Sequence, residues 1–143
     1  MKLELKHLAP YLPYGLRLRQ PVLRRGFRTR LMTVNNILDT IERQDIIKPI
    51  LRPLSDLSKD INIDGNKINP LKIILKHHEF YNSIKFIQYD NDSYIEMKGH
   101  AMITEVYSVD DSPLKIAEKL FAWHFDVFGL IEKGLAIDIN TLK

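Results

Sequence analysis

Short segments in which apolar and polar residues alternate, separated by turn residues, run through most of the chain. Alternation with period two is typical of strands that bury one face. The clearest case is residues 61–68, where Asp64-Gly65 separates two such runs and predicts a tight hairpin. In a chain of short strands separated by turns, strands that are consecutive in sequence usually pair with each other. The pattern therefore favours short antiparallel sheets.

Two further stretches predict antiparallel pairing. Residues 16–19 alternate cleanly, Gln20-Pro21 interrupts the pattern, and residues 27–34 resume it after Gly26, which predicts a two-stranded ribbon. Residues 83–107 contain three alternating runs with turn residues between them, and these predict a three-stranded meander. The tail at 134–140 alternates like a short edge strand or an ordered arm.

Proline and cap residues mark two helices. Asn69-Pro70 is typical of an N-cap followed by a first-turn proline, and predicts a helix from Pro70 to about His78. Ser112-Pro113 predicts a second helix, over residues 113–128, that Gly129 ends. This helix is apolar over most of its circumference, so it is either deeply buried or docked against a partner.

Size and composition favour one domain of the α+β class. The chain has 143 residues, which is a common size for a single domain, and 45% of them are hydrophobic. No internal repeat or low-complexity linker interrupts it. We therefore expect residues 1–143 to form a single α+β domain, in which short antiparallel hairpins and a meander are closed by a buried C-terminal helix.

Several classes of function lack sequence support. The chain has no cysteine, which excludes disulfides, a thiol nucleophile and zinc sites built on thiolates. It has neither a signal-peptide pattern nor an apolar run long enough for a membrane span, so we expect a cytoplasmic protein with no membrane partner. Because it lacks the common nucleotide, hydrolase and metalloprotease motifs, we expect no enzyme activity, cofactor, metal or small-molecule substrate.

The positive charge is concentrated near the start of the chain. Six arginines fall within residues 17–30, with no acidic residue among them. They are Arg17, Arg19, Arg24, Arg25, Arg28 and Arg30. Side chains alternate along strands, so Arg17 and Arg19 share a face, as do Arg28 and Arg30, and the hairpin is expected to present one basic surface.

Two interpretations of this cluster remain open. Arginine forks suit phosphate oxygens, and β-ribbons enter nucleic-acid grooves, which favours a nucleic-acid surface. Alternatively, the cluster is a solvated strand face whose charges meet carboxylates from the acidic second half of the chain. Phe27 is the one aromatic residue within the cluster, so stacking on single strands has little sequence support.

The histidines offer weaker candidates. His124 is predicted near the centre of the apolar face of helix 113–128, where it is either a poised acid or base or a structural histidine bonded to backbone. His77 and His78 are adjacent and so point in different directions, which argues against a metal pair. Glu79 and His100 do not form a known metal-binding motif with His77 or His78.

Three stretches resemble a group of small uncharacterised proteins encoded by phages, prophages and mobile elements of gut bacteria. They are KLELKHLAPYLPYGL at 2–16, IIKPILRPLSDL at 46–57 and LFAWHFDVFGLIEKGLAIDINTL at 120–142. The run at 123–130 is the most specific, and most of the arginine cluster lies outside the matched stretches. The resemblance implies a phage-related protein in a bacterial host cell and no particular activity.

Two functional hypotheses follow. The first is a non-enzymatic binding or accessory protein whose basic hairpin contacts nucleic-acid phosphates. The alternative is a protein–protein or homo-oligomeric module that uses the helix at 113–128 and the tail after it. Exposure of Trp123, Phe125 and Phe128 is expected in the second case, and their burial within the chain removes its main support.

Overall fold

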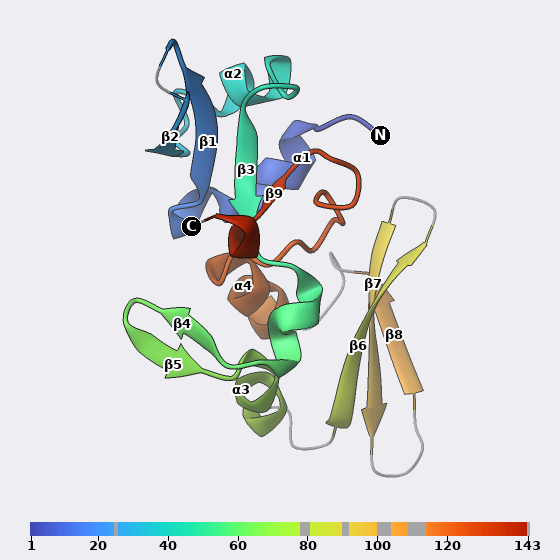
Figure 1. Ribbon diagram of the computed structural model, residues 1–143. Helices are drawn as coiled ribbons and strands as arrows, with labels where there is room; N and C mark the ends of the chain where they lie inside the picture. Colours follow the sequence, from blue (N-terminus) through green and yellow to red (C-terminus); the bar gives the residue numbers. More distant parts are fainter. Residues whose placement is uncertain (25, 78–80, 90–91, 100–103, 109–113, 143) are drawn as a thin grey trace. The chain divides into compact units, whose positions relative to one another are not determined.

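The computed structural model describes residues 1–24, 26–77, 81–89, 92–99, 104–108 and 114–142 (Figure 1). Helices and antiparallel hairpins are both present, which confirms the α+β class. The chain divides into two compact units: residues 1–53 with 121–143, and residues 54–120. That 1–143 forms a single domain stays a prediction. Among the described residues, no helix is long and apolar enough to cross a membrane.

The first unit is built on a four-stranded sheet with the order β2-β1-β3-β9. The predicted ribbon is confirmed: β1 (Arg17–Val22) pairs antiparallel with β2 (Gly26–Leu31) along its whole length. β3 (Lys48–Leu51) joins the other side of β1, also antiparallel. The predicted edge strand in the tail is β9 (Ile137–Asp138), which runs parallel to β3 although the two are far apart in sequence (Figure 1).

β1 continues through Gln20 and Pro21, where the sequence predicted an interruption. Proline lacks the backbone N–H. It is therefore tolerated in a strand at a position where no neighbouring strand needs a hydrogen bond from that N–H. β3 pairs with β1 only at Leu18 and Arg19. Pro21 lies beyond this pairing and faces Phe27 of β2, so β1 remains a strand there.

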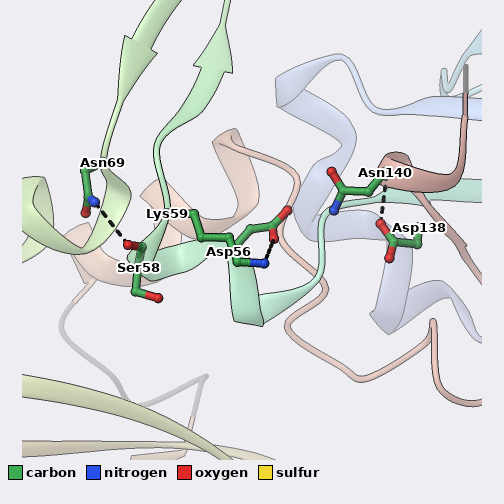
Figure 2. Close-up of polar contacts among 6 residues, drawn as sticks. All are labelled: Asp56, Ser58, Lys59, Asn69, Asp138 and Asn140. Atoms are coloured by element: carbon green, nitrogen blue, oxygen red, sulfur yellow. Dashed lines mark hydrogen bonds and ion pairs between the residues drawn. The ribbon is translucent and has the colours of Figure 1, made fainter.

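Short helices and a buried cluster complete the first unit. At the N-terminus, α1 (Leu5–Leu8) runs into the 3₁₀ helix η1 (Ala9–Tyr14). α2 (Ile37–Glu42) links β2 to β3, and η4 (Ile139–Thr141) follows β9. Asp138 begins η4 by accepting the Asn140 backbone N–H at 2.8 Å (Figure 2). The largest fully buried side chains in this unit are Leu3, Leu8, Tyr11, Leu16, Leu18, Leu51 and Phe125.

The helix predicted over 113–128 is shorter than expected. α4 spans Leu114–Ala122, and His124 has a left-handed φ of 59°. The Arg52 N–H donates to the His124 carbonyl, and the Asp126 N–H donates to the Arg52 carbonyl, both at 2.8 Å. These backbone groups therefore bond to a distant segment instead of continuing the helix. Ser112-Pro113, the predicted helix start, lies outside the described residues.

The second unit begins with a helical turn and a hairpin. The 3₁₀ helix η2 (Leu54–Ser58) is followed by β4 (Ile61–Ile63) and β5 (Asn66–Ile68), which form the predicted hairpin. Asp64 and Gly65 take positive φ angles of 51° and 82°, as a tight turn of this kind requires. Lys59 bridges back to Asp56 at 3.2 Å (Figure 2).

The predicted helix after Asn69 is also confirmed, as α3 (Pro70–His77). The Asn69 side chain accepts the Lys72 N–H at 3.2 Å. It also donates to the Ser58 carbonyl at 3.2 Å (Figure 2). It therefore caps the helix and ties it to η2. The meander follows as β6 (Tyr81–Tyr89), β7 (Asp92–Gly99) and β8 (Thr104–Ser108), paired antiparallel in that order.

Candidate nucleic-acid interface

The register of the β1–β2 ribbon determines where its arginines project. Arg19 lies opposite Thr29, whereas Arg28 lies opposite Gln20. Residues directly opposite each other in an antiparallel pair project onto the same face, and the face alternates along each strand. Arg17 and Arg19 therefore share one face and Arg28 and Arg30 share the other. The prediction of one basic surface is wrong, because the ribbon is basic on both faces.

We name the two faces after one residue each. The Phe27 face consists of Arg17, Arg19, Pro21, Phe27, Thr29 and Leu31. The Leu18 face consists of Leu18, Gln20, Val22, Gly26, Arg28 and Arg30. Leu18 is buried in the core, but all six residues of β2 are exposed because β2 is the edge strand. Arg28 and Arg30 thus remain in solvent beside a buried neighbour.

The described arginines of the ribbon do not pair with carboxylates. The ion pairs in the described part of the chain are Lys6–Glu4, Arg43–Asp39, Lys59–Asp56 and Lys98–Glu96. Two of the ribbon arginines contact neutral groups instead: Arg30 donates to the Gln20 side chain at 3.1 Å, and Arg19 lies over the Phe27 ring. Arg24 is exposed in the turn with a φ of 62°, and Arg25 lies outside the described residues.

A pocket of about 420 Å³ opens on the Phe27 face of the sheet. It is lined by Arg19, Pro21, Phe27, Asp45, Ile46, Lys48 and Ile137. The register explains why these distant residues meet, since Arg19 lies directly opposite Lys48 across β1 and β3. The Lys48 ammonium donates to the Gly134 carbonyl at 2.6 Å, which uses one of its three N–H groups.

The aromatic residues of the alternative hypothesis are partly or wholly covered. Phe125 is fully buried, and Trp123 and Phe128 are half-buried. The Phe128 ring packs edge-on against His7, at 5.3 Å between centroids, and stacks against Phe121 at 6.0 Å. Phe125 therefore contributes to the core of the first unit and presents nothing to a partner in this conformation.

A buried polar cluster supports the segment after α4. The Tyr11 hydroxyl donates to the Phe125 carbonyl and lies 3.4 Å from the Val127 nitrogen. Asp126 is buried, and its carboxylate accepts the backbone N–H groups of Leu130 and Ile131 at 2.7 and 2.9 Å. Burial raises the pKa of Tyr11, and nearby Asp126 raises it further. These contacts position backbone, which is a structural role.

His124 lies just beyond α4 and not on its apolar face. Its Nε2 is 2.6 Å from the Tyr14 carbonyl, so this nitrogen carries the proton and donates. His124 does not line the pocket on the Phe27 face. The described residues contain no group of acidic and histidine side chains arranged to hold a metal. His78, Glu79 and His100 lie outside them.

No protein-family model, curated protein or solved structure matches the chain. The resemblance to phage and mobile-element proteins therefore stays a prediction. Sequence reasoning found the arginines and Phe27 but missed Asp45, Ile46, Lys48 and Ile137, which complete the pocket. No local pattern marks them, because only the pairing of β1, β3 and β9 brings them together.

Proposed function

We propose that the β1–β2 ribbon binds nucleic acid through its phosphates, and that the protein is a non-enzymatic binding or accessory protein. The observation that carries this proposal is the set of described ribbon arginines without a carboxylate partner among the described residues. Crowded like charges repel each other, and an arginine fork can bind phosphate oxygens through two parallel hydrogen bonds.

Protection of a sheet edge does not account for the whole cluster. Charged side chains on an edge strand prevent pairing with other chains, which is a sufficient reason for Arg28 and Arg30 on β2. Arg19 lies in the part of β1 that pairs with β2 on one side and with β3 on the other. This part of the strand has no edge to protect, so Arg19 favours an external anion.

Like charges also face each other inside the sheet. Arg19 is directly opposite Lys48, an arrangement that destabilises an antiparallel pair. Asp45 is the one carboxylate lining the adjacent pocket, and it is not within 4.0 Å of either cation. A bound phosphate offsets this repulsion. Because phosphates are the same in every sequence, we expect binding with little sequence preference.

The test is binding of the full chain to labelled duplex DNA, single-stranded DNA and RNA at several salt concentrations. Four exposed ribbon arginines are replaced together: Arg17→Gln, Arg24→Gln, Arg28→Gln and Arg30→Gln. The matched control removes the same charge elsewhere, at exposed lysines: Lys2→Gln, Lys6→Gln, Lys67→Gln and Lys72→Gln. We expect the ribbon variant to lose most of its affinity and the control to retain most of it.

The salt dependence separates phosphate contacts from other binding. On duplex DNA the logarithm of the affinity falls against log salt with a slope of about 0.9 per phosphate contact. We therefore expect a steep slope for the wild type and a shallower one for the ribbon variant. Equal loss in both variants assigns binding to net charge alone, and absence of binding at low salt refutes the proposal.

The alternative, a protein–protein or homo-oligomeric module, keeps less support. Its three aromatic residues are half-buried or fully buried, and Phe125 has 0% of its surface exposed. Sedimentation of the purified chain over a range of concentrations tests it directly. A concentration-dependent dimer that Trp123→Ala abolishes supports this alternative, and a monomer throughout contradicts the homo-oligomeric form.

A further inference from the structure

The pocket on the Phe27 face combines three kinds of surface in one place. Phe27, Ile46 and Ile137 provide an apolar lining, and Phe27 is 58% exposed. Arg19 and Lys48 provide two cations from adjacent strands. Asp45 provides a carboxylate, which only accepts hydrogen bonds. Its volume of about 420 Å³ lies in the range of about 300–1,000 Å³ usual for sites that hold one small organic group.

We propose that this pocket takes one unpaired nucleotide, with its base against Phe27 and the isoleucines and its phosphate against Arg19 and Lys48. This inference rests on the proposed function and adds two preferences to its sequence-independent phosphate contacts: one for single strands, and one for the base of the single nucleotide that enters the pocket. A base inside a duplex is covered by its neighbours and cannot enter a pocket, whereas an unpaired base stacks readily on an aromatic or guanidinium plane.

The stacking surface is already formed. The Arg19 guanidinium carbon lies over the Phe27 ring, 3.9 Å from its centre, so the two side chains contact each other across the strands before any ligand arrives. Lys48 is held by the Gly134 carbonyl, and two of its N–H groups remain for a phosphate oxygen. A site whose groups are fixed before binding loses less side-chain entropy when the ligand arrives.

Asp45 gives the pocket a means of distinguishing bases. A carboxylate accepts hydrogen bonds from the exocyclic amine of cytosine, whereas thymine presents an acceptor at the same position. The pocket therefore favours cytidine over thymidine, two pyrimidines of similar size. In Asp45→Asn the side-chain amide also donates, so this difference is expected to shrink.

The experiment compares oligo(dC), oligo(dT) and a duplex of equal length, on the wild type, Phe27→Ala and Leu23→Ala. Leu23 is the matched control, because it is an 88% exposed apolar residue at the ribbon turn outside the pocket. We expect Phe27→Ala to weaken single-strand binding about ten- to a hundredfold, as loss of one stacked base does. Duplex binding should stay nearly constant, and Leu23→Ala should change neither.

A second measurement reports on the pocket itself. The methyl resonances of Ile46 and Ile137 should move on addition of oligo(dC), while that of Ile61, in the β4–β5 hairpin, should not. If the four-arginine variant loses binding but Phe27→Ala does not, and the Ile46 and Ile137 signals stay fixed, the pocket inference is overturned and the proposed function stands. If no oligonucleotide binds, both the pocket inference and the proposed function are refuted.

Discussion

The Arg19 guanidinium carbon lies 3.9 Å from the centre of the Phe27 ring, and the two side chains project from neighbouring strands onto the same face. A cation over an aromatic face stabilises by about 0.5–1 kcal/mol at exposed sites. We predict a coupling free energy of that size in a double-mutant cycle of Arg19→Gln and Phe27→Ala, measured by urea unfolding. The control is a second cycle, of Arg28→Gln and Phe27→Ala. Arg28 lies on the opposite face from Phe27, so this cycle should give a coupling free energy near zero.

The two faces of the ribbon should differ in their contribution to nucleic-acid binding. Arg17 is exposed on the Phe27 face, beside the pocket residues, and Arg28 is exposed on the Leu18 face. If the bound single-stranded nucleic acid lies along the Phe27 face, Arg17→Gln weakens its binding more than Arg28→Gln does. Fluorescence anisotropy at one low salt concentration measures both. A larger effect of Arg28→Gln than of Arg17→Gln would place the bound nucleic acid on the Leu18 face.

The Tyr11 hydroxyl should contribute to stability. It is fully buried and donates to the Phe125 carbonyl, which also accepts the Val127 N–H, so Tyr11→Phe removes one of the two hydrogen bonds to this oxygen. We expect the free energy of unfolding to fall by about 0.5–1.5 kcal/mol. The control is Tyr14→Phe, since the Tyr14 hydroxyl makes none of the hydrogen bonds seen among the described residues, and a change below about 0.5 kcal/mol is expected for it. Equal effects of the two changes would contradict this role.

Asp126 should make the protein less stable as its carboxyl ionises. Burial raises its pKa above 3.8, and backbone N–H groups from Ile131 and Leu130 offset part of that shift. The folded chain therefore binds more protons than the unfolded chain in the interval above pH 3.8, so this group's contribution to stability falls as pH rises through the raised pKa. Chemical unfolding over that interval should show a decline in the wild type that Asp126→Asn lacks.

His7 should produce the opposite trend. Its Nδ1 accepts the Glu4 N–H at 3.0 Å, so protonation of Nδ1 breaks this bond. Burial, followed by nearby Lys6, lowers the pKa of His7 from 6.5, while Glu4 opposes the shift. Below pH 6.5 the unfolded chain binds the proton more readily, so stability contributed by neutral His7 is lost as pH falls toward the lowered pKa.

The His7 effect is measured by the midpoint of urea unfolding between mildly acidic and neutral pH. We expect the difference in unfolding free energy between the wild type and His7→Leu to decrease as the pH falls below 6.5. A difference that is independent of pH would show that His7 contributes only packing against Phe128.

Local patterns were sufficient for most of the strands and for α3. The hairpin at Asp64-Gly65 and the cap at Asn69 depend on residues within a few positions of each other, so the sequence determined them. The arginines were found for the same reason, because all six lie within residues 17–30. The sequence did not show that Arg17 and Arg19 lie on the opposite face from Arg28 and Arg30. That arrangement follows from the register of the ribbon, which depends on how many residues the turn between Val22 and Gly26 contains.

Two features were decided only by the tertiary structure. α4 ends at Ala122 because the backbone around Phe125 pairs with Arg52, more than sixty residues away in sequence. The pocket exists because β3 and β9 bring Lys48 and Ile137 beside Arg19 and Phe27. In both cases the free energy comes from contacts between distant segments, and periodicity along the chain carries no information about such contacts.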